Sequence, residues 1–114
     1  MDKIRYLKLK NAGAFVVHMV IIWDGDDGNG NESHGTYEPS GYHDICAAAE
    51  RTIDLNDNTK IPNGATVKLK ADVVWGKDKT ASEEYIYDNS CGGIAEYKIS
   101  GTTLNNKLKL ETYR

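Results

Sequence analysis

The sequence predicts an all-β protein: a single antiparallel β-sandwich of about six to eight short strands with Greek-key connections. Apolar and polar side chains alternate with a period of two in several segments, which is typical of strands with one buried face. Turn-forming residues, such as Asn-Ala-Gly at 11–13 and Pro-Asn-Gly at 62–64, separate these segments. We therefore expect residues 1–114 to form one β-sandwich domain.

The alternation is clearest in residues 65–75, where Lys68, Lys70 and Asp72 share one face and the apolar side chains, Trp75 included, share the other. Such a pattern predicts a strand that is buried on one side. Shorter segments with strand-like composition predict further strands at residues 3–10, 83–88, 96–100 and 107–113.

Residues 14–23, AFVVHMVIIW, are apolar on both faces and rich in β-branched side chains. This composition favours a central strand that is covered on both sides. His18 interrupts the apolar run, and we expect it to be a core histidine that hydrogen-bonds to a neighbour.

Residues 40–55 allow two interpretations. Ser40 is a suitable N-cap for a short helix through the alanines. Alternatively, Ile45, Ile53 and the alternate positions between them line one face of an extended segment, and the Thr-Ile-Asp-Leu end favours this second interpretation.

The charge balance argues against a nucleic-acid partner. The chain has 14 basic and 17 acidic residues, a formal net charge of −3, and lysines that are scattered along the strands. A nucleic-acid or anionic-membrane surface normally needs a basic stripe, so the composition does not favour a membrane partner either. The chain begins without a signal peptide, which predicts a cytoplasmic protein or one that is secreted in leaderless or processed form.

Cys46 and Cys91 match no zinc or redox motif. A disulfide between them would close a loop of about 45 residues, worth roughly 4 kcal/mol in the chain-entropy model. We expect two free thiols ahead of this disulfide.

Four sequence blocks occur in an order that resembles a known pattern: FVVHMVIIW, RTIDL, IPNGATVKLKADVVWGK and YKISGTTLNNKLKL. They are similar to a family of small, mostly bacterial β-sandwich proteins without an established activity. That resemblance covers roughly half the chain and implies a compact β domain, but it assigns no site residue. A more distant likeness to actinoporin-type membrane-binding toxins is architectural, because this chain lacks their basic, aromatic lipid-binding cluster.

The loop WDGDDGNGNESHG at 23–35 is the candidate metal site. Calcium binds oxygen atoms of carboxylates and amides, which Asp24, Asp26, Asp27, Asn29 and Asn31 offer. The spacing does not match an EF-hand, so the alternative is a solvated hairpin loop whose charge discourages edge pairing. No other cofactor is expected.

The sequence gives little indication of a zinc site or of enzymatic catalysis. His34 and His43 are nine residues apart and match no zinc spacing. The sequence has no nucleophile elbow, HExxH motif or phosphate-binding loop, so no enzyme is expected and no catalytic residue is assigned.

Carbohydrate recognition uses aromatic faces together with planar polar groups. The chain has seven Tyr and two Trp against one Phe, a bias that suits wet recognition surfaces. The candidate ligand-binding residues are Tyr37, Tyr42, Trp75, Tyr85 and Tyr87. In the alternative interpretation, Trp23 and Trp75 close the two ends of the core and the tyrosines cover its rim.

The sequence therefore favours a small, non-catalytic, lectin-like module that binds a glycan or a surface ligand, with calcium as an optional aid. One alternative is a structural protein that assembles into homo-oligomers through its edge strands. Another alternative is a membrane-active, toxin-like β-sandwich.

Overall fold

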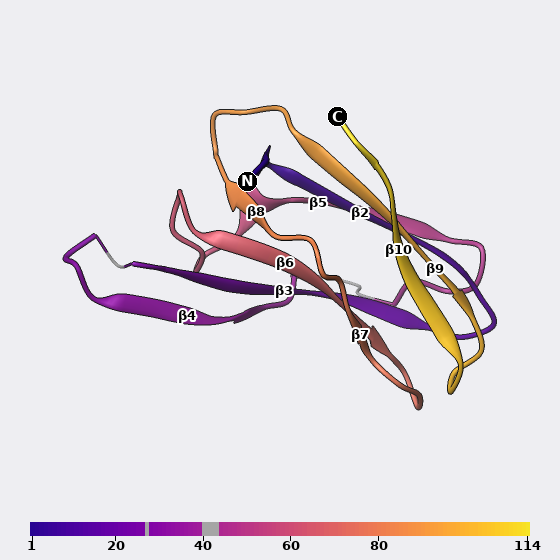
Figure 1. Ribbon diagram of the computed structural model, residues 1–114. Helices are drawn as coiled ribbons and strands as arrows, with labels where there is room; N and C mark the ends of the chain where they lie inside the picture. Colours follow the sequence, from indigo (N-terminus) through magenta and orange to yellow (C-terminus); the bar gives the residue numbers. More distant parts are fainter. Residues whose placement is uncertain (27, 40–43) are drawn as a thin grey trace.

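Two mixed β-sheets stack face to face in the computed structural model, which describes residues 1–26, 28–39 and 44–114 (Figure 1). The all-β sandwich expected from the sequence is confirmed. The described residues contain ten strands, and one 3₁₀ turn, η1 (Leu55–Asp57), is their single helical element. The count exceeds the expected six to eight partly because two strands have only two residues.

The first sheet has the strand order β1-β8-β6-β3-β4, with β7 pairing β6. Its strands are β1 (Lys3–Ile4), β3 (Val17–Asp26), β4 (Glu32–Tyr37), β6 (Thr66–Val73), β7 (Lys79–Thr80) and β8 (Tyr85–Tyr87). The pair β3–β6 is antiparallel over eight residue pairs, from Val17↔Val73 to Asp24↔Thr66. This long central pair places His18 directly opposite Asp72.

The second sheet has the order β10-β9-β2-β5 and consists of β2 (Tyr6–Gly13), β5 (Glu50–Asp54), β9 (Ile94–Gly101) and β10 (Asn106–Tyr113). The strands β2 and β9 are parallel, as are β1 and β8. These two parallel pairs depart from the purely antiparallel sandwich that the sequence predicted. Each joins the N-terminal segment to a strand from the last third of the chain.

The core lies between the sheets and follows the alternation in the sequence. In β6, Val67, Leu69, Ala71 and Val73 are buried, while their neighbours along the strand are only partly buried. The predicted alternation ends there, because Trp75 does not continue the buried face. Tyr97 of β9 is almost fully buried and its hydroxyl lies 2.9 Å from that of Tyr85, so a polar contact joins the two sheets inside the core.

The segment 44–49 forms no helix. Ile45 makes an isolated bridge to Val17, and Ala48 has a positive φ of 70° within a turn. The extended interpretation therefore holds for the described part, whereas Ser40 lies outside the described residues. Cys46 and Cys91 are both free thiols. No helix among the described residues has the length and apolarity needed to cross a membrane.

Asn11 is a fully buried polar residue that organises the start of the Asn-Ala-Gly turn. Its side-chain nitrogen donates to the carbonyls of Phe15, at 2.6 Å, and Ile45, at 2.9 Å. Its side-chain oxygen accepts from the backbone N–H of Gly13 at 2.9 Å. The side chain thereby makes three hydrogen bonds to backbone groups of the buried turn and of the neighbouring segment.

We expect Asn11→Ala to lower the free energy of unfolding by about 2–4 kcal/mol, because it removes three hydrogen bonds made by a buried side chain. Urea unfolding followed by circular dichroism measures the change. Lys10→Ala is a matched control on the neighbouring exposed position and should change stability by less than about 0.5 kcal/mol. An equally small effect of Asn11→Ala would contradict the role given to this side chain.

Candidate functional site

Two loops lie side by side at one end of the sandwich, away from both chain termini (Figure 1). One joins β6 to β7 and belongs to the first sheet, and the other joins β9 to β10 in the second sheet. The backbone N–H of Lys77 donates to the carbonyl of Thr103 at 2.8 Å, which links the loops directly. We call residues 74–78 and 102–105 the paired loops.

Trp75 is 95% exposed, more than any other large hydrophobic side chain among the described residues. Its φ of 60° lies in the left-handed region, which costs a bulky L-residue about 1–2 kcal/mol. The turn is closed by Gly76, whose N–H donates to the carbonyl of Val73 at 3.1 Å. This backbone turns Trp75 away from the buried face of β6, where the alternation alone would have placed it.

Gly76 allows the loops to approach each other. A Cβ atom at this position would lie only 2.3 Å from the carbonyl oxygen of Thr103. Any side chain here would therefore push the loops apart or disturb the Lys77–Thr103 hydrogen bond. Glycine directly after Trp75 is thus a requirement of the loop contact.

Leu104 is the exposed apolar residue of the second loop, at 66% exposure. It occupies a tight turn in which the N–H of Asn105 donates to the carbonyl of Thr102 at 3.3 Å, and the N–H of Thr102 donates back at 2.9 Å. Gly101 precedes this turn with a φ of 104°, a conformation that favours glycine. The paired loops therefore each present one large apolar side chain to solvent.

Asn106 holds the paired loops from beneath. It is 4% exposed, and its side-chain nitrogen donates to the carbonyls of Lys77, at 3.0 Å, and Thr103, at 3.2 Å. Its side-chain oxygen is buried without a hydrogen-bond partner among the described residues. The base of the first loop is held separately, since the Asp78 carboxylate accepts from the N–H of Val73 at 2.9 Å.

Lysines surround a groove of about 560 Å³ beside the paired loops. Its basic lining residues are Lys79, Lys98, Lys107 and Lys109. Glu111 is the acidic residue of the lining and forms an ion pair with Lys98 at 3.5 Å. A chain of net charge −3 thus carries a locally basic region next to the loops that expose Trp75 and Leu104.

The candidate carbohydrate residues do not form one surface. Tyr37, Tyr85 and Tyr87 are buried, at 9%, 3% and 5% exposure, and Tyr42 lies outside the described residues. The ring faces of the three buried tyrosines pack in the core, because the inward register of β4 and β8 selects these positions. Trp75 is the one candidate that the structure exposes fully.

Burial also changes the chemistry of these tyrosines. Burial is the main cause that raises the pKa of Tyr85 and of Tyr87 above the usual range. The hydroxyl of Tyr87 donates to the side-chain oxygen of Asn56 at 2.7 Å, and Tyr85 contacts Tyr97. Their polar ends are therefore used within the fold. Trp23, like the tyrosines, is a core residue, in agreement with the alternative that it closes the core.

The candidate calcium residues are distributed between a strand and a loop. Asp24 and Asp26 belong to β3 and pair with His34 and Glu32 of β4. The Asp26 carboxylate accepts from the N–H of Gly28 at 2.6 Å, so it caps the turn. Asp27 lies outside the described residues, while Asn29 and Asn31 each have an interaction partner. Calcium binding at this loop stays a prediction.

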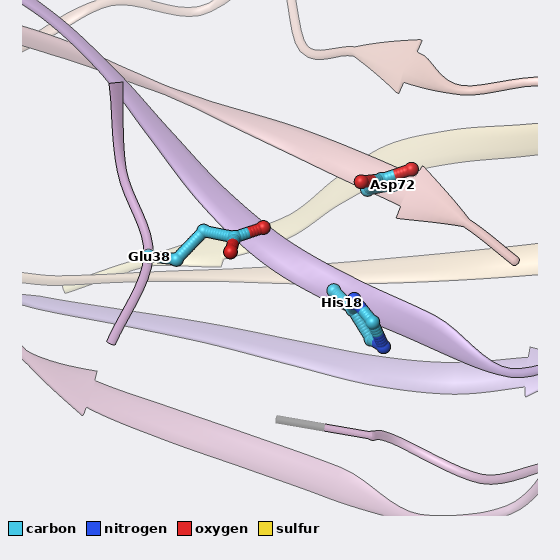
Figure 2. A group of neighbouring side chains, drawn as sticks. All are labelled: His18, Glu38 and Asp72. Carbon is cyan, nitrogen blue, oxygen red and sulfur yellow. The ribbon is translucent and has the colours of Figure 1, made fainter. Parts of the chain in front are cut away.

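A different group of metal-binding side chains is brought together by the fold. One ligand atom from each of His18, Glu38 and Asp72 lies within 4.8 Å of the others (Figure 2). His18 is on β3, Asp72 is on β6, and Glu38 follows β4. The expected hydrogen bond of His18 is present, to the carboxylate of Asp44, although the histidine is half-buried on the outer face and is not a core residue.

Asp72 has an unusual electrostatic environment. Its hydrogen bond with Asp78 is the main cause that raises its pKa, followed by desolvation and by the like charge of Asp78. Lys70 opposes this effect through its charge and forms an ion pair with Asp78 at 3.7 Å. Sequence reasoning missed this group because its members are far apart in the chain.

Among known proteins, no family model and no curated sequence matches this chain. Solved structures do match this chain. Listeriolysin O aligns over 94% of this chain and 22% of its own, with 19% identity and a TM-score of 0.51. A structure described as a Gram-negative toxin aligns over 92% of this chain and 22% of its own, with 20% identity and a TM-score of 0.50.

The membrane-binding domain of pneumolysin, solved separately, aligns over 94% of this chain and 95% of its own, with 20% identity and a TM-score of 0.48. The chain spans about a fifth of the length of the two toxins named first. At these identities the likeness is one of fold: a β-sandwich of this kind occurs as one part of larger toxin structures.

The strained backbone at Trp75 generates a stability prediction. Trp75→Gly should raise the free energy of unfolding by about 0.5–1 kcal/mol, because glycine adopts positive φ readily and the exposed indole contributes little packing. Urea unfolding measures the change. Ala48→Gly, at the other described non-glycine residue with positive φ, is the matched control and should show a gain of similar size.

Destabilisation by Trp75→Gly of more than about 1 kcal/mol would show that the indole packs on the fold. In that case its exposure could not be assigned to function.

Proposed function

We propose that this chain is a toxin-type membrane-surface module and that the paired loops are the part that enters the lipid interface. One observation carries the proposal: Trp75 is held almost fully exposed, in a costly backbone conformation, beside a second loop that exposes Leu104. Folding alone favours neither the exposure nor the strain. A bulky residue kept at an unfavourable φ points to a role outside the fold.

The chemistry of the two side chains suits the boundary of a bilayer. Tryptophan combines a large apolar ring with an N–H donor and is enriched at membrane–water interfaces. Leucine gains about 1.5–3 kcal/mol when its side chain leaves water. Two such residues support only weak binding by a single chain, so strong attachment would require several copies or additional electrostatic attraction.

The basic groove supplies that attraction. Lys79, Lys107 and Lys109 lie beside the paired loops, where lipid headgroups would be once Trp75 and Leu104 are inserted. Each lysine near an anionic lipid surface contributes about 1 kcal/mol, and the contribution falls with added salt. We therefore expect a preference for anionic lipids despite the net negative charge of the chain.

The comparisons support this proposal at the level of fold, since listeriolysin O and the Gram-negative toxin contain a similar sandwich. The lectin-like proposal has less support, because Trp75 is the one described aromatic residue of its candidate set that is not buried. Homo-oligomerisation through edge strands stays an untested alternative.

Membrane binding is tested by co-sedimentation with large unilamellar vesicles. We expect the wild-type chain to bind vesicles of phosphatidylcholine mixed with phosphatidylserine more strongly than vesicles of phosphatidylcholine alone, with a difference that shrinks as salt is added. Trp75→Gly and Leu104→Ser should each weaken binding by about tenfold or more, because each removes one apolar anchor.

Thr80→Ala, an exposed polar position on β7, is the matched control and should bind like the wild-type chain. The proposal fails if the wild-type chain binds neither type of vesicle. It also fails if a Trp75→Gly, Leu104→Ser double variant, shown to be folded, binds as well as the wild type.

A further inference from the structure

The group of His18, Glu38 and Asp72 lies just beyond the end of β4. The strand β4 ends at Tyr37, which pairs with Ile21 of β3. Pairing resumes at Ile45, whose N–H and carbonyl bond to Val17 at 2.9 and 3.1 Å. These two pairings lie on either side of His18 along β3.

We propose that His18, Glu38 and Asp72 form a binding site for a divalent transition-metal ion of the zinc class. Their ligand atoms already lie within 4.8 Å of one another (Figure 2). Figure 2 shows Glu38 extending from its own segment toward the two residues on the neighbouring strands. Three separate parts of the chain thus converge on one position, as three protein ligands around one metal ion do.

Asp44 strengthens this assignment. Asp44 directly precedes Ile45, and its carboxylate hydrogen-bonds to Nε2 of His18. Metal-binding histidines commonly use one ring nitrogen for the metal and the other for a carboxylate, which fixes the orientation of the ring. In this arrangement Nδ1 of His18 would be the metal ligand, and Asp44 would be a positioning residue.

The local charge also favours a cation. The carboxylates of Glu38, Asp44, Asp72 and Asp78 lie at or next to the site. Two lysines, Lys60 and Lys70, line a cavity of about 570 Å³ together with Glu38 and Asp72. Lys70 forms an ion pair with Asp78 at 3.7 Å, and Asp57 lines the same cavity as Lys60.

The donor set selects the type of metal. One imidazole and two carboxylates suit zinc, which accepts nitrogen and oxygen ligands and often keeps a water molecule as the fourth ligand. Calcium prefers six to eight oxygen ligands, more than this group supplies. None of the three ligand residues belongs to the acidic loop at 23–35 or to the paired loops. Zinc binding is measured without lipid, so its test is independent of the proposed membrane function.

The test is isothermal titration of zinc chloride into the chain carrying Cys46→Ser and Cys91→Ser, which removes the thiols as competing ligands. We expect one zinc ion per chain, a raised midpoint of thermal unfolding, and much weaker binding of calcium. His18→Gln and Asp72→Asn should each lower the zinc affinity by at least about tenfold.

We expect Asp72→Asn to leave the fold stable without metal, because it removes a like-charge contact with Asp78. Weaker zinc binding by this variant therefore reports on the ligand and not on unfolding. Asp24→Asn and His34→Gln are controls in the acidic loop at 23–35 and should bind zinc like the parent chain. The proposal is overturned if the parent chain does not bind zinc in the millimolar range. Unchanged binding by His18→Gln and Asp72→Asn, or calcium affinity equal to that for zinc, would overturn it as well.

Discussion

The paired loops, the candidate membrane-binding end of the molecule, depend on the hydrogen bonds of the buried side-chain amide of Asn106. Its nitrogen donates to Lys77 in one loop and to Thr103 in the other, and these loops belong to different sheets. Among the residues that the structure describes, the side-chain oxygen of Asn106 is buried without a hydrogen-bond partner, an arrangement that normally costs free energy. Loss of this bridge would leave the loops joined by the backbone hydrogen bond from Lys77 to Thr103.

The scaffold behind the loops is stable for reasons that have nothing to do with them. The long β3–β6 pair stabilises the first sheet and the parallel β2–β9 pair stabilises the second, while the buried apolar side chains between them hold the two sheets together. This rigidity lets one end of the molecule carry a strained tryptophan and an exposed leucine. In energetic terms, the stability of the core offsets the cost of the positive φ at Trp75 and of the two exposed apolar side chains.

Much of the fold follows from local pattern. The alternation in β6 and β10 and the apolar run of β3 depend on nearest-neighbour chemistry, so the sequence predicts these strands well. The parallel pairs could not be predicted in this way, because β1 meets β8 and β2 meets β9 across most of the chain length. Short segments such as β8 also gave no reason to decide which of their side chains point inward.

The candidate site was less predictable than the fold. Alternation placed Trp75 on the buried face of a strand, but a turn with positive φ, packed against Thr103, reverses its direction. The group at His18 depends on the register between β3 and β6 and on where β4 leaves the sheet. The residues of the acidic loop are adjacent in sequence, so the sequence alone indicates a candidate site there. The ligands His18, Glu38 and Asp72 are far apart in the chain, so the sequence does not indicate that they converge.

The fluorescence of Trp75 in the presence of phosphatidylcholine–phosphatidylserine vesicles tests the central claim most directly. The chain has two tryptophans, and Trp23 is buried, so a change in emission reports mainly on Trp75. We predict a blue shift of the emission on adding vesicles and quenching of Trp75 by lipids that carry a bromine label in their acyl chains. An emission maximum that does not move while the protein co-sediments with the vesicles would contradict the account, because the chain would then bind lipid through another surface.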